Sequence, residues 1–419
     1  MDSSIIKSEL LAHFGIFYLV KDIFAGKKKP KDLFAKGSVD ITFLALVIAL
    51  LTIGIIMMFS ASYVNAWYDP NAKNDPFFYV KKQVLYAVFG LTLMLIVSRV
   101  RTDVFRDASS FVLIVSLFLL LYVLINPTVI PGKEQFKRWI SVPLVGTFQP
   151  SEIAKLAVVM FLAFSMERYH KWVEKTAWTM VPYIMIIGLV CLLVYKENHV
   201  SGTLLIAGIG VATMYFGGIK IPWYFYAGIG ALILIAGIWF VFNADKFLEG
   251  YASERIRIWL KLLTGEELTT DEATGSGWQS LQSLYAIGSG GLFGLGFGNS
   301  KQKHMYIPEP QNDFVFAVVC EELGFARAFL IILLFVLLVA RGFIIGLRAR
   351  TRYEAMLAMG ISFQVGLQAA LNIAVVTSTV PNTGISLPFF SYGGTSLVML
   401  LVEMGMVLAV SRNSERKTK

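Results

Sequence analysis

The sequence predicts an all-α, multi-pass membrane protein. Of its 419 residues, 56% are apolar and only 16% are charged, whereas soluble domains carry about 25% charged residues. The mean hydropathy is +0.66. The apolar residues also gather into segments close to the length of about 20 residues that a membrane helix requires. These observations exclude the two or three soluble domains that the length alone would allow.

About ten apolar segments are expected to span the membrane. Two of them, at 83–99 and 151–166, are short for a span, whereas the others reach or approach the usual length. In chain order, the expected spans are 41–62, 83–99, 109–127, 151–166, 179–195, 201–217, 222–242, 313–340, 355–379 and 386–410.

The basic residues predict the orientation of these spans. Cytoplasmic loops carry an excess of Lys and Arg, and here the basic clusters precede the first span and follow the second, fourth, eighth and tenth. With ten spans, these positions all lie on one side, so both termini are expected in the cytoplasm. The clusters begin with Lys27, Arg99, Arg168, Arg341 and Arg412.

This orientation defines the expected organisation of the chain. Residues 1–40 form a cytoplasmic extension whose mixed apolar and charged sequence is typical of a helix lying in the membrane interface. Residues 41–411 form the membrane domain, and residues 412–419 form a basic cytoplasmic tail. The segment 128–150 and the large loop 243–312, between the seventh and eighth spans, then lie outside, where a long loop usually carries function.

The net charge of +9 does not indicate nucleic-acid binding, because the basic residues lie in short loops as membrane topology requires. Cations in the two external segments would suit an anionic lipid headgroup, and a solvated surface is the alternative. The four histidines are too scattered to predict a metal site. The external cations include Lys133, Lys137, Arg138, Arg255, Arg257, Lys261, Lys301 and Lys303.

The stretch PEPQNDFVFAVVCEELG, residues 308–324, places Asp313 against the start of a strongly apolar run. One interpretation makes Asp313 the N-cap of a helix, because Asp accepts hydrogen bonds from the first free N–H groups. The other makes it a general base at the water–lipid boundary, since apolar surroundings favour proton uptake by a carboxylate. The residues alone leave both interpretations open.

Four further ionisable residues lie inside predicted spans. Such groups are costly in a membrane and normally face the protein interior. We expect them to pair in a buried network that holds the helices, in preference to acting in catalysis. They are Glu321, Glu322, Arg327 and Glu403.

Glu152 and Lys155 lie three residues apart in a predicted span, so they share one helix face and can pair. Pro150 and Ser151, just before them, suit the start of a helix. A structural ion pair and a role in shaping an external site are both open.

The glycine-rich segment 286–300 has no strand–helix–strand setting, so it is a weak match to a dinucleotide-binding motif. Its glycines would let backbone N–H groups approach a phosphate, or would let the segment pack tightly. Both interpretations stay open.

Five motifs occur in order along the membrane portion. They are KRWI at 137–140, QPSEIAK at 149–155, GWQSLQSLYAIGSGGLFGLGFGNSKQK at 277–303, PEPQNDFVFAVVCEELG at 308–324 and NIAVVTSTVPNTGISLPFFSYGGTSL at 372–397. Together they resemble the SEDS proteins (shape, elongation, division and sporulation), the RodA/FtsW peptidoglycan polymerases. The resemblance extends over nearly the whole chain beyond residue 40.

The resemblance implies glycosyl transfer on lipid II at the outer face of the bacterial cytoplasmic membrane, with undecaprenyl pyrophosphate leaving. It implies that Asp313 is the general base, and it favours Arg138 and Lys301 as the cations that stabilise the pyrophosphate charge. The implied substrate-binding residues are Arg138, Trp139, Gln149, Ser151, Glu152, Lys155, Gln282, Ser283, Lys301, Glu309 and Asn372.

The sequence departs from the family pattern at two places. Many members carry Pro-Asp-Xaa-Gly-Thr where this chain reads ENHVSGT at 197–203, so no role of that aspartate transfers to this chain. Arg327 stands where the family usually has glycine, which affects the expected helix packing but not the chemistry.

The partners implied by the resemblance are lipid II, membrane lipids and a cognate class B penicillin-binding protein that acts as transpeptidase. No cofactor is assigned, and a requirement for a divalent cation stays open. Two other functions stay open: a flippase or transporter of the lipid-linked precursor, and a non-enzymatic scaffold of the wall-synthesis complex. A transporter would carry its charges near the membrane midplane on broken helices, whereas the richest motifs here are external.

Overall fold

The computed structural model describes residues 34–35, 37–128, 137–142, 146–173, 177–224, 251–266, 268–275 and 277–414. These residues are almost wholly helical. The helices are α3 (Ile41–Tyr68), α4 (Phe78–Val97), α5 (Thr102–Ile125), α6 (Pro150–Arg168), α7 (His170–Val173), α8 (Met180–Lys196), α9 (Val200–Phe216), α11 (Tyr251–Thr264), α12 (Thr270–Thr274), α13 (Trp278–Gly290), α14 (Val315–Leu347), α15 (Arg352–Val376) and α16 (Gly394–Asn413). Short 3-10 turns occur at η2 (Pro70–Ala72) and η3 (Ala177–Thr179), and β1 (Ile140–Val142) pairs antiparallel with β2 (Gly146–Phe148).

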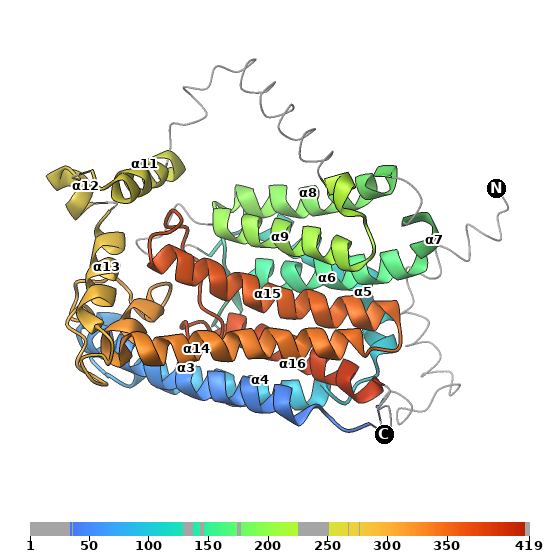
Figure 1. The fold of residues 1–419 in the computed structure, drawn as a ribbon, viewed down its shortest axis with the longest axis horizontal. Coiled ribbons are helices and arrows are strands. Elements are labelled where there is room, and N and C mark those ends of the chain that lie inside the picture. Colours follow the sequence, from blue (N-terminus) through green and yellow to red (C-terminus); the bar gives the residue numbers. More distant parts are fainter. Residues whose placement is uncertain are drawn as a thin grey trace, which may run out of the picture.

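The long helices run side by side as one bundle (Figure 1). Helix α16 packs against α4, α15 packs against α14, and α6 packs against α5 and α9. Helices α11, α12 and α13 lie beyond one end of the bundle, which we call the loop end (Figure 1). Helices α6 and α14 both begin at this end, so the residues before them meet there.

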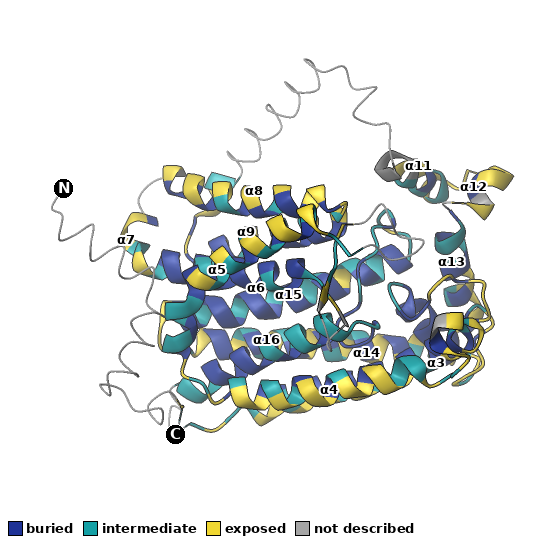
Figure 2. Ribbon diagram, turned by 180° about the vertical axis from the view of Figure 1, so that it is seen from behind, coloured by how far each residue is buried: buried dark blue, intermediate teal, exposed yellow. Residues whose placement is uncertain are grey.

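Burial separates a membrane-facing surface from a protein interior. Six described helices, α3, α4, α5, α14, α15 and α16, are long and apolar enough to cross a membrane, and α8 and α9 are shorter apolar helices. Exposed residues follow the outer side of α4, and buried residues dominate the centre of the bundle (Figure 2). The exposed side chains on α4 include Leu85, Val88 and Phe89. Large apolar side chains exposed on such helices are expected to face lipid, so this is an integral membrane protein.

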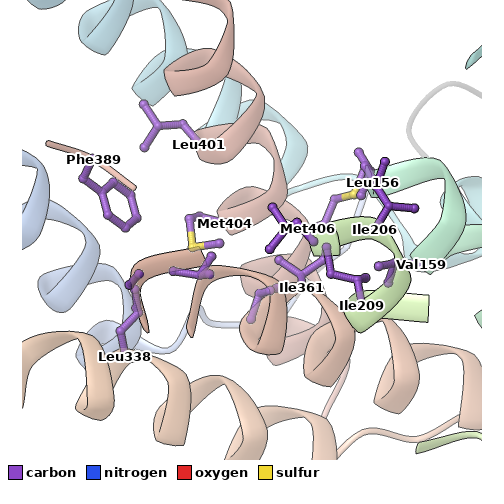
Figure 3. Close-up of a cluster of buried hydrophobic side chains, with 14 of the residues drawn as sticks. Leu156, Val159, Ile206, Ile209, Leu338, Ile361, Phe389, Leu401, Met404 and Met406 are labelled. Atoms are coloured by element: carbon purple, nitrogen blue, oxygen red, sulfur yellow. The ribbon is translucent and has the colours of Figure 1, made fainter. Parts of the chain in front are cut away.

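Helix α6 is the central helix, because nearly all of its residues are buried. Its Leu156 and Val159 pack in an apolar cluster with Ile206 and Ile209 of α9, and Ile361 of α15 lies in the same cluster (Figure 3). The close packing of this core fixes the depth and rotation of α6, and therefore of the polar residues at its first turns.

The expected spans match observed helices in position, but only six described helices are long and apolar enough to cross a membrane, so the number of ten spans stays a prediction. Each one coincides with a helix except 222–242, which lies almost entirely outside the described residues. Three expected starts were wrong by several residues. Helix α4 begins at Phe78 where the span was expected from 83, and α5 begins at Thr102 where it was expected from 109. The last span was expected from residue 386, but α16 begins only at Gly394.

The residues before α16 form a non-helical segment buried inside the bundle. Leu387, Phe389 and Phe390 are each at most 2% exposed. Polar side chains from neighbouring helices satisfy parts of its backbone: Gln83 donates to the carbonyl of Ser391 at 3.2 Å, and Gln368 donates to that of Ser386 at 3.0 Å. Irregular backbone is tolerated at membrane depth only where protein supplies such partners. Hydropathy alone therefore extended the helix too far.

Helix α14 is kinked at Gly324, which has a φ of 77°. The kink frees main-chain groups on both sides, and the glycine-rich loop binds them: Leu295 N–H donates to Glu321 O at 3.0 Å, and Phe325 N–H donates to Gly291 O at 2.9 Å. A Cβ at Gly294 would overlap the carbonyl of Glu322. The contacts of this glycine-rich segment thus support the tight-packing interpretation.

Candidate functional site

Asp313 lies in the turn before α14, at the loop end. The side-chain amide of Asn372, on α15, donates to the carbonyl of Asp313 at 2.7 Å and to that of Ile385 at 2.6 Å. The N-cap of α14 is Phe314, so the interpretation of Asp313 as the N-cap is wrong. The backbone of Asp313 is held by α15 through the bond from Asn372.

The segment before α16 approaches the Asp313 carboxylate. Gly384 has a φ of 69°, and a Cβ added there would lie 3.0 Å from Asp313 Oδ2. On its other side, the carbonyl of Gly384 accepts a hydrogen bond of 3.4 Å from Ser201 at the start of α9. Gly384 therefore lies between the Asp313 carboxylate and the start of α9. Its positive φ favours glycine at that position.

The predicted pairing of Glu152 with Lys155 is confirmed. Lys155 Nζ lies 3.0 Å from Glu152 Oε2, and both side chains are largely buried, at 6% and 12% exposed. Each partner has a second contact: Lys155 donates to Gln368 Oε1 at 3.2 Å, and Ser396 donates to Glu152 at 3.1 Å. A buried ion pair requires such additional bonds to offset desolvation.

Three amides on α15 form a stripe that the sequence analysis missed. Gln364, Gln368 and Asn372 are spaced four residues apart, so they lie on one face of the helix. All three are buried. Gln364 donates to Glu403. Gln368 accepts from Lys155 and donates to Ser386. Asn372 donates to the carbonyls of Asp313 and Ile385. The spacing of amides in an otherwise apolar helix was a visible signal for this stripe.

A second polar group gathers where α6, α9 and the β1–β2 hairpin meet. Gln149 donates to Ser151 at 3.0 Å, and His199 Nδ1 lies 3.3 Å from Gln149 Nε2 and 3.5 Å from Ser151 Oγ. The guanidinium of Arg138 donates to the carbonyl of Asn198. The motifs at 137–140, 149–155 and 197–203 are therefore neighbours in the fold.

Burial and nearby cations keep His199 neutral. Desolvation is the largest cause, and the positive charges of Arg138 and Lys155 add to it, so the pKa of His199 lies well below its usual value. A neutral imidazole beside Gln149 and Ser151 offers one donor and one acceptor, which suits hydroxyl or amide groups of a carbohydrate.

Several predicted site residues lie apart from these contacts. Ser283, on α13, donates to the carbonyl of Val376 at 2.7 Å and thereby joins α13 to the end of α15. Gln282 is also buried on α13. Lys301 has an exposed side chain, and its N–H donates to Glu321 at 2.9 Å.

Two other candidates, Trp139 and Glu309, make contacts of their own within the described structure. The carbonyl of Trp139 accepts from Thr128 N–H at 2.8 Å. Glu309 has a φ of 46°, and it accepts from the side chain of Asn312 at 2.7 Å.

The expected buried network among the four ionisable residues was wrong in its pairing. Glu322 pairs with Lys303, Nζ to Oε1 at 2.7 Å, and Glu321 accepts hydrogen bonds from the main chain of Lys301 and Gln302. Arg327 donates to the carbonyl of Phe293, and Glu403 accepts from Gln364. The two adjacent glutamates therefore hold the preceding loop.

The same contacts correct the expectation that Lys303 belongs to an external basic patch, because its side chain is buried. Within the described ranges, no cluster of three or more His, Cys, Asp or Glu side chains could hold a metal ion.

Fold and site together define a multi-pass membrane protein with a fixed carboxylate and buried polar groups at one end of its bundle. A model of the cell cycle protein family of FtsW, RodA and SpoVE matches residues 41–416, and the chain belongs to this family, as the resemblance to the SEDS proteins implied.

Curated relatives match along most of the chain. Stage V sporulation protein E of Bacillus subtilis (strain 168) is 38% identical over 381 residues, which cover 90% of this chain and 98% of that protein. A probable peptidoglycan glycosyltransferase FtsW of Trichlorobacter lovleyi is 34% identical over 387 residues, covering 92% of this chain and 95% of that protein.

Solved structures share the fold. A chain of a peptidoglycan synthase complex, studied for its structural coordination of polymerization and crosslinking, has a TM-score of 0.71 and 26% identity, and covers 89% of this chain and 98% of its own. The rod shape determining protein RodA of Thermus thermophilus has a TM-score of 0.61 and 23% identity, with coverage of 90% and 98%.

Proposed function

We propose that this protein is a peptidoglycan glycosyltransferase that polymerises lipid II into glycan strands. The observation that carries the proposal is the hold of Asn372 on the backbone of Asp313, which fixes one carboxylate at the loop end. Curated relatives named as probable peptidoglycan glycosyltransferases support the reaction class.

In the proposed reaction, the 4-hydroxyl oxygen of the acceptor's N-acetylglucosamine attacks C1 of the donor's N-acetylmuramic acid. The bond from C1 to the pyrophosphate oxygen breaks, and undecaprenyl pyrophosphate leaves with the electron pair. Asp313 takes the hydroxyl proton. A hydroxyl needs this help near neutral pH, whereas pyrophosphate is a good leaving group, so one well-placed base suffices.

Cations near the loop end would stabilise the leaving pyrophosphate. Arg138 is our first choice, because it lies beside His199 and Asn198 at the meeting point of three motifs. The Lys155–Glu152 pair is nearly neutral as a unit and is better suited to fixing α6 than to binding an anion. Lys301 has an exposed side chain that could meet a headgroup arriving from the membrane surface.

We further propose that the loop end faces the outside of the bacterial cytoplasmic membrane and that both termini are cytoplasmic. The basic loops support this orientation. A cysteine at Thr270, which is exposed on α12, should react with an impermeant thiol reagent in intact cells, whereas one at Ser414 should not. Thr270 is preferable to Thr269 because the latter caps α12.

The proposed partner is a class B penicillin-binding protein that crosslinks the new strands. The similar chain from a complex that coordinates polymerization and crosslinking supports this assignment. The partner would work on the same side as the loop end.

The test of the function is strand formation from lipid II by equal amounts of purified wild type, Asp313→Asn and Glu309→Gln. Asp313→Asn nearly keeps the size of the side chain and the backbone bond from Asn372, but its amide does not take up the proton. Loss of a general base typically lowers the rate by about 10²–10⁴-fold. Glu309→Gln, in the same loop, should have the milder effect.

Near-normal strand synthesis by Asp313→Asn would overturn the role of Asp313. Absence of synthesis by the wild type, alone and with its partner, would overturn the function itself. Movement of lipid II across vesicles without synthesis would instead favour the flippase alternative. The polar contact that would serve this function is that of Glu403 with Gln364, which are buried together between α15 and α16.

A further inference from the structure

Glu197 is a buried acid that the proposed reaction does not use. It follows the last residue of α8, within the segment 197–203 that departs from the family pattern. The side chain is 0% exposed. Neither carboxyl oxygen has a hydrogen-bond partner among the described residues. Burying an ionised carboxylate without donors is strongly unfavourable, so its charge must depend on what lies nearby.

The nearby charge is Arg138. This cation acts on Glu197 directly, and its guanidinium also binds the carbonyl of the next residue, Asn198. His199, one residue further on, is neutral, and Lys155 of α6 acts on His199. Burial is the stronger influence on Glu197 and raises its pKa to about 8, while Arg138 opposes that rise. The acid is therefore mostly neutral at pH 7 and becomes ionised above pH 8.

We propose that Glu197 controls the affinity of Arg138 for an anionic diphosphate: the neutral acid permits binding, and the ionised carboxylate opposes it. The inference rests on the proposed function only in taking a diphosphate as the ligand of Arg138. Two anions beside one cation repel each other, so a diphosphate bound at Arg138 drives a proton onto Glu197. A proton lost from Glu197 in turn weakens the bound diphosphate.

The sign and size of this effect follow from linkage. Proton uptake on binding means that affinity is highest below the pKa of Glu197 and falls as the pH rises through it. If the bound anion raises that pKa by about one unit, the dissociation constant increases roughly fivefold between pH 6.5 and pH 9. In the reaction, ionisation of Glu197 would favour release of the diphosphate product.

The experiment measures binding of inorganic pyrophosphate to the purified full-length protein in neutral detergent by calorimetry, from pH 6.5 to pH 9. We compare wild type, Glu197→Gln and Glu197→Asp. Because the pyrophosphate ionises identically in each titration, differences between the proteins belong to residue 197. Between pH 6.5 and pH 9, the affinity of the wild type and of Glu197→Asp should fall roughly fivefold relative to that of Glu197→Gln, whose pH dependence reports the ionisation of pyrophosphate alone. Arg138→Gln should not bind.

Sulfate, whose charge is constant over this range, is a second probe for the wild type alone, and its affinity should also fall with pH. Parallel pH curves for wild type and Glu197→Gln, a sulfate affinity that is independent of pH, or binding that survives Arg138→Gln would each overturn the inference. Lipid II polymerisation by the wild type is assayed separately. A wild type that makes no strands counts against the proposed function, whereas the binding curves decide the role of Glu197 independently.

Discussion

Asn372 and Asp313 are joined by a hydrogen bond of 2.7 Å from a side-chain amide to a main-chain carbonyl. The same nitrogen donates to Ile385 at 2.6 Å, so one buried amide joins the turn before α14 to the segment before α16. Neither partner is a side chain, which means that the contact positions Asp313 without engaging its carboxylate. Asn372 is therefore a positioning residue.

Asn372→Ala should lower strand synthesis by about 10²-fold, because a catalytic group displaced by about 1 Å commonly loses that much rate. Asn372→Asp should be worse, since a carboxylate would face two carbonyl oxygens. The measurement is polymerisation of lipid II per amount of folded protein. Asn382→Ala is the matched control, because that amide donates to Gln279 on α13, and it should retain most activity. Full activity in Asn372→Ala would remove the residue from the positioning of Asp313.

Gly324→Ala should destabilise the protein. The position has a φ of 77°, and a Cβ there would overlap the main-chain nitrogen of Gly294. The backbone conformation alone costs a residue with a side chain about 1–2 kcal/mol, and the overlap adds to this. The check is thermal unfolding in detergent against Gly188→Ala, a helical position with open space around it, which should be neutral or slightly stabilising. Equal melting temperatures for both variants would show that the loop does not depend on the kink.

The sequence was sufficient for the long apolar helices of the bundle and for one ion pair, but not for α11, α12 and α13, which lie inside the expected loop 243–312. Hydropathy locates apolar segments, and the i,i+3 spacing of Glu152 and Lys155 follows from helix geometry. It was insufficient around residues 386–393, because a segment buried in protein is as apolar as one that faces lipid. Whether that segment is helical depends on its backbone dihedral angles, and hydropathy carries no information about those angles.

The partners of charged residues were also hidden from the sequence. Glu321 and Glu322 bind a loop about 20 residues earlier in the chain, and the main chain beyond the kink at Gly324 binds an earlier part of the same loop, at Gly291. Glu197 illustrates the same limit, since nothing in ENHVSGT indicates that Arg138, on a hairpin about 60 residues earlier, would be its neighbour.

Glu152→Ala and Lys155→Ala should each lose activity and stability, because removing one partner of a buried pair leaves an unpaired charge at a cost of about 3–5 kcal/mol. The exchange of the two residues should recover only part of the loss. In the exchanged protein, the carboxylate at 155 would face Gln368 Oε1, an acceptor, while Ser396 would face an ammonium group. Polymerisation and thermal unfolding of the four proteins test this, and a fully active single variant would exclude the pair from the site.

Lys303→Met should lower both the stability and the activity of the protein, although Lys303 lies outside the turn that carries Asp313. It removes the cation that lies 2.7 Å from Glu322 Oε1, where the two side chains are 5% and 0% exposed. Ser60 of α3 donates to the same carboxylate at 2.7 Å, but a neutral hydroxyl does not balance its charge. The unpaired carboxylate should cost about 3–5 kcal/mol. Because the loop that Lys303 anchors leads directly to Asp313, we expect activity to fall with stability.

The double variant Lys303→Met with Glu322→Leu decides whether the charge is the cause. Replacing both partners of a buried pair by apolar residues is often neutral, so the double variant should unfold at a higher temperature than Lys303→Met alone. Lys81→Met is the control for loss of a lysine, because its pair with Asp75 lies at the surface, with 67% of the Lys81 side chain exposed, and it should change little. If Lys303→Met unfolds at the same temperature as Lys81→Met, the pair does not hold the loop, and Asp313 must be positioned by α15 alone.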